Sequence, residues 1–392
     1  MTAVVDPPVG RTPPAAGPDR AAEAVARPRR EFGPVRWVPR AVVLLALAWW
    51  ALVYVPGTFA YSAFAADACI YAIIGLSLNI VIGYTGQLSL GHQGFVGVGA
   101  FAAAYSLTVQ EVPFAATFVI AAGLAAVFAL VLGLVALRIT GLYLALITLV
   151  FGLTLEGSLF EIPRFTNGGA GQPADRPQFL FDDGRFYLFC LAFLVLACYV
   201  DYRLLRSKTG RALLALKENE RVAEAFGINV TAFKLIAFTL SGALAGVAGA
   251  LFAYRIGIVT GSGFGFFLAL TFVLMTVVGG LGDRLGVIMG SSFFAVLPFL
   301  LEDSPLKRAE EAIAGVLSFG DAGTEANIIQ FFPQALGALL LLLTLVQFPG
   351  GLAQQVRPFT DWLKGEPFDA RALLPHRGSS GPGTVEGSSV RA

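Results

Sequence analysis

Residues 114–137 read FAATFVIAAGLAAVFALVLGLVAL, a run of 24 residues without a charged side chain. About 20 apolar residues allow an α-helix to cross the hydrocarbon core of a bilayer. The rest of the chain has the same character, because 56% of its 392 residues are hydrophobic and only 14% are charged. A soluble domain carries about 25% charged residues. The sequence therefore predicts an all-α, polytopic membrane protein.

The composition argues against several other classes of protein. Three Cys and two His are too few for a disulfide scaffold or zinc-rich chemistry, and a net charge of +1 argues against a nucleic-acid binder. The apolar runs are too continuous for outer-membrane strands, which alternate over about ten residues. We therefore expect a lipid bilayer as the surroundings, with no metal site and no nucleic-acid partner.

Runs of this kind predict about ten membrane-spanning helices. They lie at residues 41–55, 68–82, 95–107, 114–137, 142–160, 186–205, 232–256, 264–278, 287–301 and 328–346. Lys and Arg concentrate on the cytoplasmic side of membrane proteins. The N-terminal arm holds seven Arg and the 201–234 loop holds seven Lys or Arg, whereas the 161–185 and 302–327 loops have more acidic than basic residues. A topology of ten spans with both termini in the cytoplasm places the two basic segments in the cytoplasm and the two acidic loops outside.

The expected organisation has three parts. Residues 1–40 form a disordered, basic, Pro/Ala/Arg-rich cytoplasmic arm, residues 41–347 the transmembrane domain, and residues 348–392 a largely disordered cytoplasmic tail. The AFA at 63–65 loosely resembles a signal-peptide cleavage site, but the arm before it is long and the segment contains the bulky Trp49 and Trp50. We therefore expect a first helix that is retained.

Two Gly-rich segments interrupt the apolar pattern, and both are candidate broken segments of the membrane domain. Residues 83–94 read GYTGQLSLGHQG and residues 279–286 read GGLGDRLG. Their lead-ins, 81–87 and 277–283, align as a weak internal repeat of parallel orientation. Short, Gly-interrupted apolar segments at corresponding positions of two halves point to a transport pathway. Two plain cytoplasmic turns remain the alternative.

Polar and glycine residues around these segments are the candidates for a translocation path. They are Asn79, Gly83, Tyr84, Gly86, Gln87, Ser89, His92, Thr148, Gly279 and Gly282. The uncharged groups either line a path or form hydrogen bonds across helices. Asp67, Glu156 and Arg255 lie near the outer ends of spans, where a rim or snorkelling role is as good an interpretation as substrate contact.

The chain offers no expected catalytic residue. Ser89 and His92 are close in sequence, but no third group that would orient them is evident. We therefore predict that the chain is not an enzyme.

A different local pattern, GxxxG at 242–246 followed by Gly249, is expected to allow close helix packing.

Residues 211–227 predict an amphipathic helix between two spans. Its apolar face combines positions 212, 216, 219, 223 and 226, and Gly227 would end it. Such a helix either lies on the bilayer surface or provides a docking surface for a cytoplasmic subunit. The candidate docking residues are Arg211, Lys217, Glu218, Asn219, Glu220, Arg221, Glu224 and Gly227.

Several of these stretches together resemble a known family. They are LSLNIVIGYTGQLSLGH at 76–92, GRA at 210–212, ENE at 218–220, EAFGINV at 224–230, KL at 234–235, VGGLG at 278–282 and TNGG at 166–169. They are similar to the signatures of permeases of branched-chain amino-acid ABC importers, in particular the LivM type. The resemblance covers about residues 68–348. Residues 93–94 and 208–209 depart from the pattern, which leaves the substrate open, because permeases for urea or short amides share much of it.

The resemblance implies one half of a heterodimeric pore in a bacterial-type plasma (inner) membrane. It implies three kinds of partner: a second, LivH-like permease subunit completes the pore, two cytoplasmic ATP-binding subunits dock on residues 211–227 as a coupling helix, and an extracytoplasmic substrate-binding protein delivers the solute. Transport would be inward, by ATP-driven alternating access.

The chain itself contains no G-x-x-x-x-G-K-[ST] motif, so ATP would be bound by partners and no cofactor is expected on this chain. An ion-coupled secondary transporter is the alternative. It would need ion or proton ligands within its spans, which are scarce here, and it would not require a cytoplasmic helix.

Overall fold

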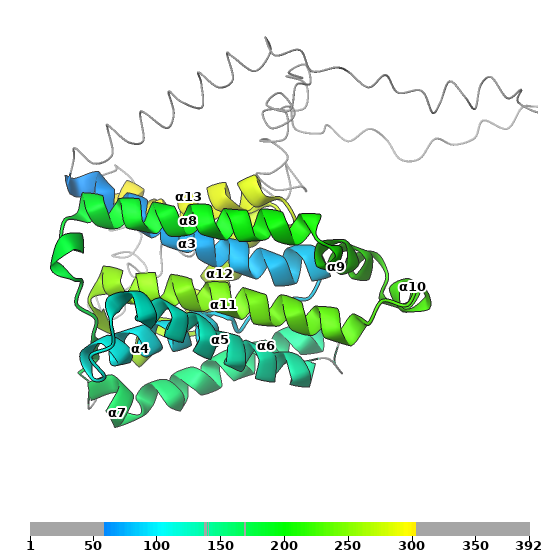
Figure 1. Cartoon of the computed structure of the whole chain (residues 1–392), viewed down its shortest axis with the longest axis horizontal. Helices are drawn as coiled ribbons and strands as arrows, with labels where there is room; N and C mark the ends of the chain where they lie inside the picture. Colours follow the sequence, from blue (N-terminus) through cyan, green and yellow to red (C-terminus); the bar gives the residue numbers. More distant parts are fainter. Residues whose placement is uncertain (1–58, 137–138, 140, 168–169, 303–392) are drawn as a thin grey trace, which may run out of the picture. The chain divides into compact units, whose positions relative to one another are not determined.

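The computed structural model describes residues 59–136, 139, 141–167 and 170–302, and they form a bundle of long helices (Figure 1). The long helices are α3 (Phe59–Thr85), α4 (His92–Thr108), α5 (Phe114–Ala136), α6 (Leu142–Gly157), α8 (Asp183–Arg206), α11 (Val230–Ile256), α12 (Phe266–Gly279) and α13 (Arg284–Glu302). The shorter elements are η2 (Leu159–Glu161), α7 (Pro163–Thr166), β1 (Gln172–Pro173), η4 (Gln178–Leu180), α9 (Lys208–Glu218), α10 (Glu220–Ala225), β2 (Ile258–Val259) and η5 (Gly261–Phe264).

Eight of the ten expected spans coincide with these long helices. The expected spans at 41–55 and 328–346, like the whole of both expected tails, lie outside the described residues. Within the described part, six helical segments are long and apolar enough to cross a membrane: Ser62–Thr85, Phe114–Val135, Leu142–Glu161, Asp183–Arg206, Val230–Ile256 and Gly261–Gly279. The structure thus shows a polytopic, all-α membrane protein, and the total of ten spans stays a prediction.

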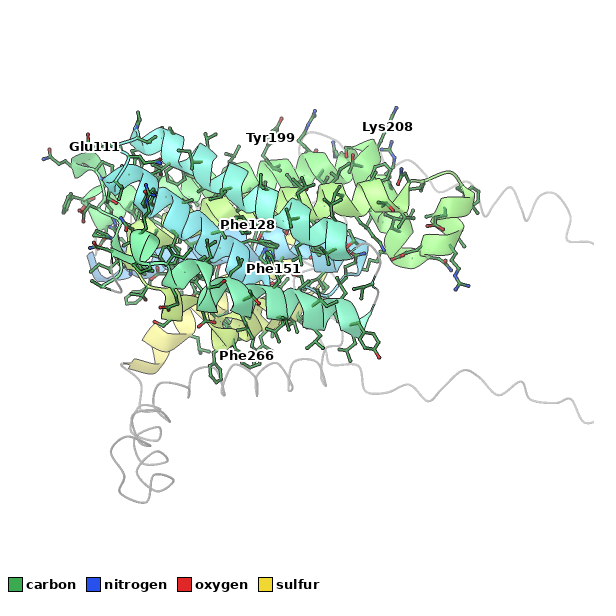
Figure 2. The ribbon with its side chains drawn as sticks, turned by 90° about the horizontal axis from the view of Figure 1, so that it is seen from below. Glu111, Phe128, Phe151, Tyr199, Lys208 and Phe266 are labelled. Atoms are coloured by element: carbon green, nitrogen blue, oxygen red, sulfur yellow. The ribbon has the colours of Figure 1, made fainter. Side chains whose placement is uncertain are left out.

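The bundle has two distinct ends. Helices α9 and α10 lie at one end, which we call the α9 end, and α7 lies at the other, which we call the loop end (Figure 1). Figure 2 shows the same polarity, with Lys208 and Glu111 at opposite ends. At the loop end β1 pairs antiparallel with β2, with Gln172 opposite Val259.

Helix α3 lies in the interior of the bundle. Of its membrane window, 78% is buried, and it packs against α8, α11, α12 and α13. Its sequence explains this position, because its residues are apolar or small around the whole circumference and a helix that is apolar on all sides belongs in a core. Its polar residues Ser77 and Asn79 are therefore buried as well.

The small-residue stripe on α11 packs as predicted. A Cβ on Gly246 would lie 2.4 Å from the Ala121 carbonyl oxygen of α5, and a Cβ on Gly249 would lie 2.1 Å from the Val96 carbonyl oxygen of α4. Both separations are shorter than any real contact, so only glycine allows α11 to approach these backbones. The prediction of close packing at the GxxxG motif is confirmed.

The outer surface of the bundle is apolar, as a lipid-facing surface should be. Val119 of α5 is 73% exposed, Tyr143 of α6 75% and Val195 of α8 62%. Phe266, at the start of α12, also points away from the bundle (Figure 2). A soluble protein could not carry such a surface, and a bilayer accommodates it.

Candidate functional site

The two Gly-rich breaks lie side by side. The backbone N–H of Gly282 in the second break donates a hydrogen bond of 2.8 Å to Asn79 Oδ1 on α3. A Cβ on Gly83 would lie 2.8 Å from that same Gly282 nitrogen, so the absence of a side chain at 83 permits the contact. Segments about 200 residues apart in the sequence (|i−j| of 203) thus meet at one place.

Both breaks are shorter than the sequence predicted. Gly83 and Tyr84 belong to α3 and Gly279 to α12, so the non-helical stretches are residues 86–91 and 280–283. The chain turns where backbone conformations favour glycine, with φ of +73° at Gly86 and +87° at Gly282. His92, expected within the first broken segment, is instead the first residue of α4.

Lys217 of α9 lies against both breaks. A Cβ on Gly86 would lie 3.5 Å from Lys217 Cγ, and a Cβ on Gly282 would lie 3.7 Å from Lys217 Nζ. The aliphatic stem therefore follows the first break, and the ammonium group reaches the second. This one side chain places the predicted docking region in contact with the predicted path.

A buried carboxylate joins three helices at the same end. Asp201 of α8 is fully buried; its Oδ1 accepts a hydrogen bond from Tyr84 Oη of α3 at 2.8 Å, and its Oδ2 accepts one from Arg284 Nε of α13 at 2.5 Å. Tyr84 and Arg284 flank the two breaks. The sequence assigned no role to Asp201, because residue 201 was counted both at the end of the expected 186–205 span and in the basic 201–234 loop, whereas the structure places it within α8, which continues to Arg206.

The predicted single helix at 211–227 is wrong in detail. The structure has two helices, α9 and α10, separated at Asn219, whose backbone is extended with φ of −163°. The Asn219 side chain accepts hydrogen bonds from the backbone N–H groups of Arg221 and Val222 and so caps α10. An Asn that competes with the helix backbone in this way was the signal for the interruption.

The predicted apolar face is correct for Ala212, Leu216 and Ala223, which are buried, and wrong for Asn219 and Phe226. Phe226 is 83% exposed, because the interruption at 219 rotates α10 relative to α9. The candidate docking residues Arg211, Lys217, Glu218, Asn219, Arg221, Glu224 and Gly227 are all exposed. The α9–α10 unit therefore presents charged side chains around an exposed aromatic ring.

A second ion pair, buried only on the Lys234 side, attaches α10 to the bundle. Lys234 Nζ of α11 lies 2.7 Å from Glu220 Oε1 of α10, and the exposed fractions of the two side chains are 4% and 38%. The sequence analysis assigned Glu220 to docking and assigned no role to Lys234. Displacement of α10 would therefore act on α11 through Glu220 and Lys234.

The start of α4 forms a second group of polar residues. His92 Nε2 lies 2.7 Å from Ser77 Oγ of α3, and Thr148 Oγ1 of α6 accepts a hydrogen bond of 2.9 Å from the backbone N–H of Leu90. Gln87 and Ser89 of the break are buried, at 7% and 0% exposed. Helix α6 thus lies directly over residues 86–94.

Among the described residues, two ion pairs lie at the loop end. Arg255 Nε of α11 lies 2.9 Å from Asp67 Oδ1 of α3, and Arg176 Nη1 lies 2.7 Å from Asp183 Oδ1. Asp67, expected to precede its span, lies within α3. Among the residues that the structure describes, no group of three His, Cys, Asp or Glu could hold a metal ion.

An apolar cavity of about 360 Å³ lies apart from this site, between α4, α5 and η2. Its lining includes Phe101, Tyr105, Leu124, Phe128 and Leu159. Phe128, one of these lining residues, is labelled in Figure 2. None of the predicted path or docking residues lines it.

Comparisons with known proteins agree with the resemblance. Residues 60–303 match the model of a family described as branched-chain amino acid transport system / permease component. The high-affinity branched-chain amino acid transport system permease protein LivM of Escherichia coli K12 is 34% identical over 268 residues, which cover 60% of this chain and 62% of that protein. LivM of Salmonella typhimurium LT2 is 33% identical over 268 residues, which cover 60% of this chain and 62% of that protein.

A relative that matches a shorter part of the chain is named for a different substrate. The autoinducer 2 import system permease protein LsrC of Klebsiella pneumoniae is 36% identical over 118 residues, 28% of this chain and 34% of that protein. The chain spans about 62% of the length of the LivM proteins that it matches, and no solved structure matches it significantly. Because the family model covers more than half of the chain, the protein belongs to the branched-chain amino acid transport system permease family.

Proposed function

We propose that the chain is a permease subunit of an ABC importer that moves branched-chain amino acids inward across a bacterial-type plasma membrane. The LivM relatives, which are named as branched-chain amino acid permeases, support the substrate class. The partners of the proposed importer are a second, LivH-like permease, two cytoplasmic ATP-binding subunits and an extracytoplasmic binding protein. ATP is bound by the partners, and this chain needs no cofactor.

The contact of Lys217 with both breaks is the observation that carries the proposal. Helices α9 and α10 offer an exposed surface to a cytoplasmic subunit, and Lys217 connects this surface directly to Gly86 and Gly282. A force on α9 therefore reaches both segments at which α3 and α12 end. In this mechanism the α9 end is cytoplasmic, and both chain termini lie on the same side.

Alternating access requires hinge segments whose backbone can change conformation, and the two breaks have the backbone properties of hinges. Residues 86–91 and 280–283 lie between helices and contain glycines at positive φ, so they can change conformation at lower cost than a helix interior. Asn79, Tyr84, Gln87, Ser89, His92 and Thr148 supply polar atoms beside these hinges. We propose that these residues, with the glycines at 83, 86, 279 and 282, line the path of the solute.

The experiment is uptake into proteoliposomes by the full complex of this chain with its partner subunits. We expect ATP-dependent uptake of radiolabelled L-leucine in the presence of the binding protein. The Glu224→Lys variant, which reverses one charge on the proposed docking surface, should lose uptake and partner binding while it still inserts in the membrane. Glu111→Lys, a matched charge reversal at the loop end (Figure 2), should retain partner binding.

The outcomes separate the alternatives. Normal uptake by Glu224→Lys with all partners bound would refute the docking assignment. Uptake that needs an ion gradient and no ATP would favour a secondary transporter. ATP-dependent uptake of urea or acetamide in place of L-leucine would change the substrate class and keep the importer.

A further inference from the structure

Polar atoms without partners are concentrated at the start of α4. Ser89 Oγ, His92 Nδ1 and both amide atoms of Gln93 have no hydrogen-bond partner among the described residues. The three side chains are 0%, 1% and 0% exposed. A buried polar group normally has a partner, because leaving it unpaired is costly, so this concentration requires an explanation.

The same place is the N-terminus of a 17-residue helix. Gly91 is the N-cap residue of α4 and makes no side-chain capping hydrogen bond. The first backbone N–H groups of a helix have no partner within the helix, and the helix dipole makes this end positive. Together they form a setting that favours an anionic group.

The proton positions follow from the neighbouring contacts. Ser77 Oγ donates its proton to the Ile74 carbonyl at 2.6 Å, so His92 Nε2 must be the donor in the contact with Ser77. His92 Nδ1 therefore carries a lone pair and can only accept. The start of α4 thus combines donors, on Ser89 and Gln93, with an acceptor on His92.

Helix α6 covers this group closely. A Cβ on Gly91 would lie 1.9 Å from the Thr148 carbonyl oxygen, and a Cβ on Gly152 would lie 2.4 Å from Gln93 Nε2. Glycine at both positions lets α6 rest on the polar atoms without bonding to them. The hydrogen bond from Leu90 to Thr148 holds α6 in this place.

We propose that the start of α4 is a subsite for a zwitterionic amino acid, which becomes accessible when α6 moves away. The carboxylate is bound by the backbone N–H groups of His92 and Gln93, Ser89 Oγ and Gln93 Nε2, since the N–H of Gly94 already donates to the Gly91 carbonyl. The ammonium group donates to His92 Nδ1. This inference rests on the proposed function, because it assigns the substrate's charged groups to atoms of the proposed path.

The test measures ligand binding without transport. The full complex without the binding protein is unfolded by heat in the presence of L-leucine, 4-methylpentanoate or L-leucinol. A ligand that binds only the folded state raises the midpoint of unfolding. We expect L-leucine to raise it, 4-methylpentanoate to raise it less, and L-leucinol, which lacks the carboxylate, to leave it unchanged.

Three variants locate the effect. Gln93→Met replaces the amide with an apolar group of similar size, and Ser89→Ala removes the hydroxyl; both should abolish the shift caused by L-leucine. Ser291→Ala is the matched control, because it removes a buried, unpartnered hydroxyl from α13, where Ser291 faces Gly75 of α3. It should retain the shift. Gln93→Met should also lower uptake roughly tenfold, as expected when a hydrogen bond to a charged group is lost.

The results separate this subsite from the proposed function. An equal shift with L-leucinol, no shift with L-leucine, or a shift that survives in Gln93→Met and Ser89→Ala would each overturn the subsite. Uptake by the unmodified complex would leave the proposed function standing in all three cases. A carboxylate-dependent shift without ATP-driven uptake by any complex would support the subsite and refute the importer.

Discussion

Removal of the Asp201 carboxylate should destabilise the α9 end of the bundle by an amount that the structure allows us to work out. Asp201→Ala deletes the acceptor of two hydrogen bonds, from Tyr84 at 2.8 Å and from Arg284 at 2.5 Å. A hydrogen bond to a charged group contributes ~1.5–3 kcal/mol, so the two together give ~3–6 kcal/mol. The Arg284 side chain is 25% exposed, and water can partly replace its lost partner. We therefore expect a loss of ~3–4 kcal/mol.

Asp201→Asn separates the two contributions to this loss of stability, the hydrogen bond from Tyr84 and the charge opposite Arg284. The Asn carbonyl oxygen can still accept from Tyr84, but the charge opposite Arg284 is gone, so the loss should be about half of that for Asp201→Ala. The matched control is Asp283→Asn. Asp283 accepts from the backbone N–H groups of Leu285 and Gly286, and Asn caps helices as well as Asp, so this variant should stay within ~0.5 kcal/mol of the unmodified protein.

The assay is reversible unfolding of the purified full chain in mixed micelles, with the free energy of unfolding as the readout. Equal losses for Asp201→Ala and Asp201→Asn would show that the Tyr84 bond contributes nothing. A loss below ~1 kcal/mol for both variants would refute the view that Asp201 joins three helices, because a surface ion pair would account for a loss of that size.

Two further predictions concern packing and coupling. Gly246→Val should cost ~1–3 kcal/mol in the same assay, because its side chain would collide with α5, whereas Gly123→Val, with no atom within 4 Å of its Cβ, should be tolerated. Equal stability of the two would contradict the packing described for α11. Lys217→Ala should lower uptake per ATP hydrolysed, measured in proteoliposomes on complexes that have retained their partners, while Lys208→Ala at the same end should not. An unchanged ratio in Lys217→Ala would disprove coupling through this side chain.

Much of the fold follows from the sequence, because lipid imposes simple rules on helices. Eight long helices, six of them in segments long and apolar enough to cross a membrane, were predicted from apolar runs, and the glycine packing on α11 and the positions of the two breaks were predicted from glycine spacing. These features are local, or they repeat along one helix. The lengths of the breaks were not predicted well, since α3 continues through Gly83 and Tyr84, where tertiary packing sustains the helix.

The sequence did not predict which side chains are partners within the candidate site. Asp201 meets Tyr84, 117 positions away, and no periodic pattern marks either as the partner of the other. Lys234 was missed for a different reason: its partner Glu220 was interpreted as part of an uninterrupted helix and assigned to docking. The interruption at Asn219 had a local signal, the capping preference of Asn, which the regular spacing of apolar residues concealed.

The interior position of α3 has a consequence for biogenesis. A ribosome makes α3 before every other described helix, yet the helices that enclose it include α11 and α13, which follow it by more than 140 residues. During synthesis Ser77 and Asn79 therefore face lipid or the insertion machinery until the last covering helix arrives. A nascent chain that stops before residue 284 lacks α13, so the face of α3 that α13 covers stays exposed. Membrane quality-control proteases could recognise such a product by the polar groups that the finished bundle hides.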